Sequence, residues 1–230
     1  MISVVIPYYN HKEALQRSLA SLQAQTFQDI EVIIVDDGSE NKLEIGDSEM
    51  NIHLVHQENK GAPSTRNKGF ELSKGEYVIF WDADLIAKPD MLATMQDALE
   101  KNIDASFVYS NFIFGKKKMA AQPFDITSLK QQNYIHSSSL IRRKDAITWD
   151  ESLKKFQDWD YFLTLVEQGK KGVWIDKYLF EIETGGTMSE WLPRFAYHAP
   201  FKWLPGIAKR VQKYERAKKI IQKKHHVLYD

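Results

Sequence analysis

Short apolar runs alternate with helical patterns along most of the chain. The apolar runs that we expect as strands lie at 2–6, 30–35, 52–55, 77–81, 105–114, 137–141 and 173–183. Leucines at helical spacing, Leu15, Leu19 and Leu22, separate the first two runs, so the chain is expected to open with a strand, a helix and a parallel strand. Pro63 and Pro89 stand near the starts of two further expected helices, and a third is expected at about 159–167. This alternation predicts an α/β fold with a mainly parallel sheet flanked by helices.

The C-terminal part of the chain has a different pattern. Residues 191–203 are rich in aromatic side chains and interrupted by prolines, and apolar residues then recur at helical spacing among many lysines, at Ile207, Val211, Tyr214 and Ile221. This pattern predicts a basic amphipathic helix. Two readings stay open: the helix docks on an anionic membrane surface, or it packs on its own domain and leaves its cationic face in water.

Composition and charge narrow the class of protein. With 43% hydrophobic and 27% charged residues the chain is a folded globular protein. Cysteine is absent, which excludes disulfides, cysteine-ligated zinc and a thiol nucleophile and fits a reducing compartment. The net charge of zero hides an asymmetry, because residues from Arg194 onward hold 10 Lys and Arg against 2 acids, which leaves 21 against 29 before them. The first expected strand leaves no room for a leader and no run is long enough to span a membrane, so we expect a cytoplasmic protein.

Polar side chains follow three of the expected strands where each strand ends. Asn10 follows the first, Asp36 and Asp37 the second, and Asp82 and Asp84 the run at 77–81. Open α/β sheets bind ligands along this edge, and a pocket rich in carboxylates favours a cation. Asp82 and Asp84 offer two hard oxygen ligands that suit Mg²⁺ or Mn²⁺, with diphosphate oxygens and water completing the shell. The alternative is that one aspartate caps the next helix and the other is solvated.

Four motifs together resemble the family 2 glycosyltransferases of GT-A fold. They are Val-Val-Ile-Pro-Tyr-Tyr-Asn at 4–10, Val-Asp-Asp-Gly-Ser at 35–39, Gly61 with Arg-Asn-Lys-Gly at 66–69, and Trp-Asp-Ala-Asp at 81–84. The resemblance is close over 1–115 and looser over 135–185. It implies a Rossmann-like GT-A domain at 1–190, with a nucleotide-sugar half at 1–115 and an acceptor half at 116–190, followed by a C-terminal extension at 191–230.

The resemblance also assigns residues to the donor. It implies that Pro7 and Tyr9 line the nucleoside pocket, that Asp37 accepts a hydrogen bond from the base, and that Asp36 supports it. An acceptor facing an imide N–H favours uracil, hence a UDP-sugar. Arg66 resembles the family's basic residue near the base and diphosphate, and Asp82 is expected to contact the nucleotide as well as the metal. The alternatives are a plain turn at 36–39 and a surface ion pair for Arg66.

The string at 156–161, Phe-Gln-Asp-Trp-Asp-Tyr, resembles the family's acidic motif at the start of a helix. Asp158 matches the general base, Gln157 stands where the family often has Glu, and Asp160 is a rival for the role of base. A helix N-terminus favours aspartate in any case, so a plain helix cap is the alternative. The metal at Asp82 and Asp84 would neutralise the UDP leaving group while Asp158 removes the acceptor proton, and direct displacement inverts the anomeric centre.

Three more residues are candidates for acceptor or sugar contacts: His136, Trp159 and Asp160. Their alternatives are an ordinary loop histidine, a core aromatic residue and a helix cap. Gly185 and Gly186 are read as a loop over the donor or a turn, and 116–118 as a solvated lysine loop.

The sequence thus predicts a metal-assisted (Mn²⁺ or Mg²⁺), inverting hexosyltransferase of surface-polysaccharide or glycolipid biosynthesis. Its expected partners are a UDP-sugar and a saccharide or lipid-linked saccharide acceptor, with peripheral membrane contact at the inner face of the cell membrane through 205–224 and no nucleic acid. A nucleotidyltransferase is an alternative, although 7–14 lacks the glycine-rich loop such enzymes carry. A catalytically inactive sugar-nucleotide binder is another.

Overall fold

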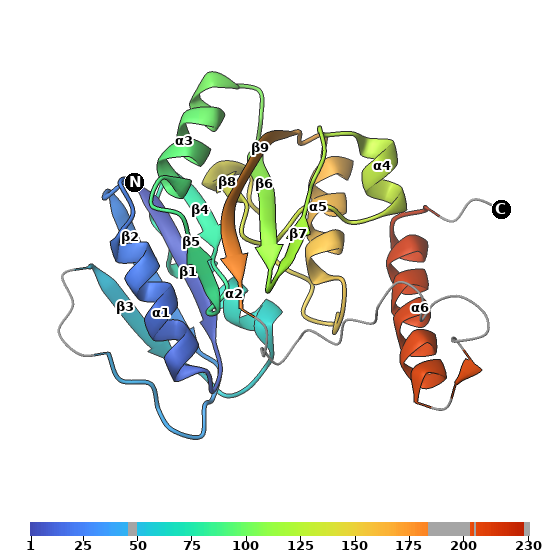
Figure 1. Ribbon diagram of the computed structural model, residues 1–230, viewed down its shortest axis with the longest axis horizontal. Coiled ribbons are helices and arrows are strands. Elements are labelled where there is room, and N and C mark those ends of the chain that lie inside the picture. The colour runs from blue at the N-terminus through green and yellow to red at the C-terminus, as the bar shows by residue number, and fades with distance from the viewer. Residues whose placement is uncertain (46–49, 184–202, 205, 228–230) are drawn as a thin grey trace.

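A computed structural model gives the fold of the chain and describes residues 1–45, 50–183, 203–204 and 206–227. The strands are β1 Ile2–Tyr8, β2 Ile30–Asp36, β3 Ile52–His56, β4 Tyr77–Phe80, β5 Leu85–Ala87, β6 Phe107–Phe114, β7 Lys117–Met119, β8 Leu140–Arg142 and β9 Gly172–Ile182. The α-helices are α1 Lys12–Gln23, α2 Ala62–Leu72, α3 Met91–Lys101, α4 Ile126–Gln131, α5 Gln157–Glu167 and α6 Ile207–Lys224. In the described part of the chain the strands form one sheet of order β3-β2-β1-β4-β8-β6-β9-β5, with β7 paired to β6 (Figure 1).

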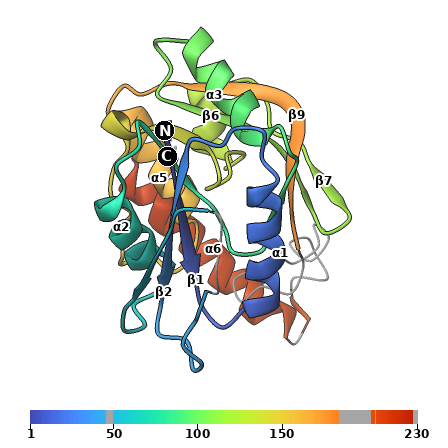
Figure 2. The ribbon, with the colours of Figure 1, turned by 90° about the vertical axis from the view of Figure 1, so that its left-hand side faces the viewer.

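The first half of the sheet is parallel, as predicted. β1 pairs with β2 and β4, and β3 pairs with β2, all in parallel register. Figure 2 shows α1 on one side of β1 and β2 and α2 on the other, so the strands are covered on both faces and consist of continuous apolar runs. Because these strands run the same way, their carboxyl ends meet at one edge, and the polar residues that follow them are brought together there.

Close packing of α2 on β1 depends on Gly69. A Cβ atom at this position would collide with Cγ1 of Val5, a fully buried residue of β1. The glycine therefore lets the helix axis approach the strand, and this approach helps to place Arg66, one turn into α2, at the edge of the sheet.

The second half of the sheet is mixed. β8 runs antiparallel to both β4 and β6, and β5 runs antiparallel to β9, whereas β6 and β9 are parallel. The prediction of a lysine loop at 116–118 is wrong, because a turn at Gly115, whose φ is 57°, leads into β7. The lysines are nevertheless exposed. β5, β7 and α4 were not predicted, since three to six residues carry too little periodicity to be recognised.

The expected basic helix is α6, and its apolar stripe faces the domain. Val211 and Ile221 are buried, and Ile221 belongs to the core that α5 also covers. Lys224 and His225 contact Asp160 of α5, so α6 lies beside α5 (Figure 1). The reading in which the helix packs on its own domain is confirmed for these residues. The aromatic segment at 191–202 and Gly185 and Gly186 lie outside the described residues. Within those residues, no helix has the length and apolar character needed to cross a membrane.

Candidate active site

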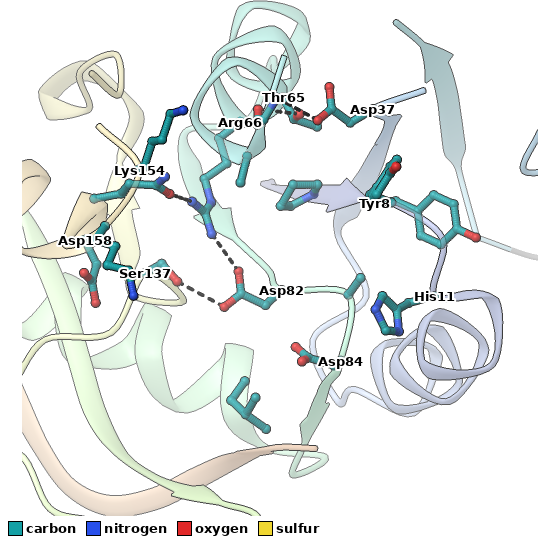
Figure 3. Close-up of a pocket in the computed structure, with 18 of the residues that line it drawn as sticks. Tyr8, His11, Asp37, Thr65, Arg66, Asp82, Asp84, Ser137, Lys154 and Asp158 are labelled. Carbon is teal, nitrogen blue, oxygen red and sulfur yellow. Dashed lines mark hydrogen bonds and ion pairs between the residues drawn. The ribbon is translucent and has the colours of Figure 1, made fainter. Parts of the chain in front are cut away.

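A cavity of about 730 Å³ opens at the carboxyl ends of β1, β2 and β4. Figure 3 shows Ser137, Lys154 and Asp158 across the cavity from Tyr8 and His11. Tyr214 of α6 also lines the cavity. Among the residues predicted from the sequence, those that line it are Pro7, Tyr9, Asp37, Arg66, Asp82, Asp84, His136 and Asp158. One cavity thus joins residues that are scattered over the first 158 positions of the chain.

Asp37 lines the cavity and is held by three hydrogen bonds. Its Oδ1 accepts hydrogen bonds from Gln57 Nε2 at 2.8 Å and from the amide of Lys60 at 2.9 Å, and its Oδ2 accepts one from the amide of Gly61 at 2.8 Å. The carboxylate is 5% exposed, and its remaining lone pairs are available to a ligand. Gly61 belongs to a motif recognised in the sequence, whereas Gln57 and the amide of Lys60 were not recognised as partners of Asp37.

Asp36 lies behind Asp37 and does not line the cavity. Burial opposes its charge, but hydrogen bonds from Ser39, from the amide of Leu43 and from His56 outweigh that cost and hold the pKa of the Asp36 carboxyl below its ordinary value. An ionised Asp36 therefore organises the turn after β2 that presents Asp37. Residues 36–39 thus form a turn, as the alternative interpretation held, and Asp36 can also support Asp37 within that turn.

Arg66 is buried at the centre of the site. Its Nη2 lies 3.0 Å from Asp82 Oδ1, its Nη1 donates to Gln157 Oε1 at 3.2 Å, and its guanidinium lies 4.6 Å from the ring centre of Trp149. The side chain is only 4% exposed, so the reading as a surface ion pair is wrong. Gln157, which stands where the family often has Glu, gives Arg66 a neutral acceptor. Within the described residues, the carboxylate that forms an ion pair with Arg66 is therefore that of Asp82.

Asp84 is the electrostatically strained carboxylate of the cavity. Burial, and then the charge of Asp82, raise the pKa of Asp84 to about 7. Asp82 is stabilised by Arg66 and by a hydrogen bond from Ser137 Oγ at 3.2 Å, whereas no ion pair of Asp84 occurs in the described part of the chain. A cation beside both carboxylates would relieve this repulsion.

The donor set fits a hard divalent cation that a ligand helps to hold. In the residues that the structure describes, no group of three His, Cys, Asp or Glu side chains is arranged as a protein-only metal site. Asp82 and Asp84 would be the protein's ligands, and the remaining oxygens would come from a diphosphate and water, as Mg²⁺ and Mn²⁺ accept.

Asp158 lies in the first turn of α5 and faces the cavity (Figure 3). Its Oδ1 accepts from the amide of Trp159 at 2.9 Å, and its Oδ2 accepts from Asn133 Nδ2 at 2.7 Å. Burial raises the pKa of the Asp158 carboxyl, and the positive side chain of Arg66 opposes this rise, so the carboxylate is a stronger base than an exposed one. Asn133 is a site residue that the sequence did not reveal.

His136 packs against the stacked rings of Phe112 and Phe180, with ring centres 4.6 and 5.2 Å away. Burial lowers its pKa, so the ring is neutral near pH 7. The amide of Ser138 donates to Nδ1 at 3.1 Å, which leaves the proton on Nε2, 3.7 Å from Asp82 Oδ2. The residue is therefore more than an ordinary loop histidine, since it presents a donor to the cavity.

Trp159 and Asp160 lie outside the cavity, so the structure does not bring them to the acceptor. Trp159 is 1% exposed and its Nε1 donates to the carbonyl of Leu129 at 2.6 Å. Asp160 Oδ1 lies 2.7 Å from Lys224 Nζ and 2.8 Å from His225 Nε2. An α-helix turns about 100° per residue, which explains why Asp158 faces the cavity while Asp160 faces α6.

Comparison with known proteins identifies the family. Residues 3–154 match the model of glycosyl transferase family 2. The chain belongs to this family. The glycosyltransferase GlyG of Streptococcus pneumoniae is 40% identical over 118 residues, which are 49% of this chain and 39% of GlyG. The chain therefore spans about two fifths of the length of this curated relative.

Solved glycosyltransferase structures share the fold. Residues 1–349 of S. aureus TarS in complex with UDP-GlcNAc have a TM-score of 0.70 at 18% identity, over 97% of this chain and 71% of that fragment. The mannosyltransferase PcManGT of Pyrobaculum calidifontis, in complex with GDP-Man and Mn²⁺, has a TM-score of 0.64 at 16% identity, over 98% of this chain and 69% of PcManGT. The GT-A fold implied by the motifs is thus confirmed. The family 2 match ends at 154, so Phe156, Asp158 and Tyr214 lie beyond the matched segment.

Proposed function

We propose that this family 2 glycosyltransferase moves a sugar from a UDP-sugar to an acceptor hydroxyl, with inversion and with the help of Mn²⁺ or Mg²⁺. The observation that carries the proposal is the single cavity that joins Asp37, the pair Asp82 and Asp84, and Asp158. Figure 3 shows Asp37 and Asp158 on opposite sides with Asp82 between them. This order matches a nucleoside, a diphosphate and an acceptor laid side by side.

The donor end favours uracil. Asp37 offers fixed acceptor oxygens beside Pro7 and Tyr9, and an acceptor pairs with the imide N–H of uracil. Tyr9 is 37% exposed and can pack on the base when it enters. The UDP-GlcNAc complex of TarS supports a UDP-sugar, whereas GDP-Man in PcManGT shows that the fold also takes a purine donor.

Asp84, together with Asp82, would hold the divalent cation. A bound Mn²⁺ or Mg²⁺ supplies charge neutralisation to the diphosphate as it leaves. Arg66 Nη2 positions Asp82 through their ion pair, and its delocalised charge is suited to phosphate oxygens. The Mn²⁺ in the PcManGT complex supports this choice of metal.

Asp158 would remove the proton of the acceptor hydroxyl as its oxygen bonds to the anomeric carbon and the bond from that carbon to the diphosphate breaks. Attack from the side opposite the leaving group inverts the anomeric centre. Asn133 and the amide of Trp159 each donate to one carboxylate oxygen, so they fix the orientation of the base while leaving lone pairs for the acceptor.

The acceptor proposed is a saccharide or lipid-linked saccharide of surface-polysaccharide or glycolipid assembly, reached from the cytoplasmic side with α6 near the membrane. The exposed lysines of α6 support an approach to an anionic surface. Product analysis separates the alternatives, because a glycosyltransferase releases UDP, a nucleotidyltransferase releases pyrophosphate, and an inactive binder releases neither.

Two variants test the proposal. Calorimetry should show that UDP binds much more tightly with Mn²⁺ than with chelator, and that Asp84→Ala loses this difference while the exposed control Asp104→Asn keeps it. A screen of UDP-sugars and GDP-Man then finds the donor. With that donor, Asp158→Asn should lower turnover by a factor on the order of 10² or more and leave UDP affinity nearly unchanged. Metal-independent UDP binding, or full turnover of Asp158→Asn, would overturn the corresponding assignment.

A further inference from the structure

Tyr214 connects the active-site cavity with a second hollow on α6. Within the described residues it is the member of α6 that lines the cavity, and it also lines a hollow formed by Glu215, Lys218, Lys219 and Gln222. A ligand that leaves the cavity beside Asp158 can therefore pass over the tyrosine ring onto the basic face of the helix.

The ring of Tyr214 belongs to an aromatic wall. It meets Phe156 edge to face, with ring centres 5.0 Å apart and an angle of 71° between the planes, and Phe156 meets Trp159 in the same way at 5.8 Å. Phe156 has φ of 58° and ψ of 30°, a left-handed conformation that a bulky residue adopts only where its surroundings impose it, and such positions gather at functional sites. Phe156 also lines the cavity, two positions before Asp158.

Positive charge surrounds this wall. Lys154 and Lys155 line the cavity, and Figure 3 shows Lys154 on the Asp158 side, across from Asp37 and Tyr8. Lys218 and Lys219 line the hollow, where Glu215 is the one acid among the lining residues. Lys218 follows Tyr214 by one helical turn, so the two side chains are neighbours on the helix surface. The path from the cavity to α6 therefore favours an anion.

Contacts at the end of α6 anchor this helix to α5 and to Asp150. His225 is 3% exposed and bridges Asp160 and Glu167 with 2.8 Å contacts on its two ring nitrogens, while Lys224 bridges Asp150 and Asp160. α5 thus presents Asp158 to the cavity and anchors α6 through Asp160.

We propose that α6 completes an acceptor subsite for a saccharide that carries a phosphate group. The sugar would pack on the Tyr214 and Phe156 rings, its hydroxyl would point to Asp158, and its phosphate would bind Lys218 and Lys219. The inference rests on the proposed function, since it assumes that Asp158 faces the acceptor. It assigns to α6 a part in substrate selection.

The test uses the full chain with UDP and Mn²⁺, and saturation-transfer NMR as the binding measurement. The probes are N-acetylglucosamine 1-phosphate and glucose 1-phosphate, each compared with its uncharged methyl glycoside. The phosphorylated probes should bind more tightly by on the order of tenfold, as expected for charge-assisted contacts, and salt should reduce the difference. A parallel arm uses neutral vesicles with and without phosphatidylinositol, so that a soluble sugar phosphate and the same chemistry on a lipid are distinguished.

Four variants locate the subsite. Lys218→Gln should remove most of the preference for phosphate, whereas Lys223→Gln, the same charge change elsewhere on α6, should keep it. Tyr214→Leu should weaken the binding of all saccharide probes. Tyr214→Phe, which keeps the ring and the packing on Phe156, should bind them as the wild type does. UDP affinity should be unchanged in all four variants.

The outcomes are separable. If UDP and Mn²⁺ do not bind the wild-type chain, the proposed function fails. If UDP binds but neither the soluble nor the vesicle-held phosphates are preferred, or if Lys218→Gln and Lys223→Gln behave alike, the subsite is overturned while the proposed function stands. Preference for only one of the two phosphate sources supports the subsite and identifies the source.

Discussion

The ionised carboxylate of Asp84 should lower the stability of the folded protein when no metal is bound. Burial and the neighbouring Asp82 raise the pKa of Asp84 from 3.8 to about 7, which means that the folded state resists its ionisation. Replacing Asp84 by Asn keeps the shape of the side chain and removes the charge. We therefore expect Asp84→Asn to be more stable than the wild type at pH 8 in the presence of a chelator.

The magnitude follows from the pKa change. One pKa unit corresponds to about 1.4 kcal/mol, so a rise from 3.8 to about 7 represents roughly 4 kcal/mol at most. Solvent screening at the cavity mouth reduces this, and we expect a gain of about 2 kcal/mol in the free energy of unfolding. Because the pKa of Asp84 is higher in the folded than in the unfolded state, the free energy of unfolding falls as the pH rises. The contribution of Asp84 to stability is complete below pH 3.8 and is lost as the pH rises to about 7.

Urea denaturation at several pH values checks this reasoning. The advantage of Asp84→Asn should be largest above pH 7 and should shrink as the pH falls toward 4. Adding Mn²⁺ and UDP should stabilise the wild type more than the variant, and Asp104→Asn, at an exposed position, should follow the wild type throughout. A variant that is less stable than the wild type at pH 8 in chelator would refute the account of Asp84 as a strained carboxylate.

Three further outcomes are expected. Asn133→Ala removes a hydrogen bond that favours the ionised form of Asp158, so the acid limb of the turnover profile should move to higher pH; an unchanged profile would show that Asn133 has no such role. Gly69→Ala should lose about 1–3 kcal/mol of stability in urea, because the new methyl group meets Val5; unchanged stability would mean that α2 shifts freely. The full chain should co-sediment with anionic but not neutral vesicles at low salt, and less so after exposed basic residues of α6 are replaced by Gln at Lys209, Arg210 and Lys223; equal sedimentation with both kinds of vesicle would remove the membrane proposal.

The donor half of the site was predictable because it depends on short stretches of sequence. Each motif follows an apolar strand, and parallel strands bring their carboxyl ends to one edge, so Asp37, Asp82 and Asp84 had to lie near one another. The mixed half was less predictable. β5 and β7 have three residues each, and partners such as β6 and β9 are chosen by the assembled sheet rather than by local pattern.

The acceptor side depends on contacts between distant parts of the chain. Helical geometry predicts that Asp158 and Asp160 point to different sides of α5. Only the contacts of Lys224 and His225 with Asp160 show that α6 covers the Asp160 side. Asn133 has no motif around it, and Tyr214 reads as one member of an apolar stripe. Their place at the cavity follows from how α4, α5 and α6 pack, which the sequence pattern does not encode.

The shared anchoring of α5 and α6 also limits how this protein can be recombined with its relatives. In a chimera joined between the two helices, α5 with Asp158 would come from one protein and α6 from another. The contacts of Asp160 and Glu167 of α5 with Lys224 and His225 at the end of α6 would then be lost. A junction before Phe156, near the end of the family match at 154, keeps Asp158 and the contacts of Asp160 and Glu167 with α6 in one piece, and it separates them from Asn133 and Asp150. The C-terminal part from Phe156 onward is therefore the unit to exchange in order to alter the proposed acceptor site while the proposed nucleotide-binding half is retained.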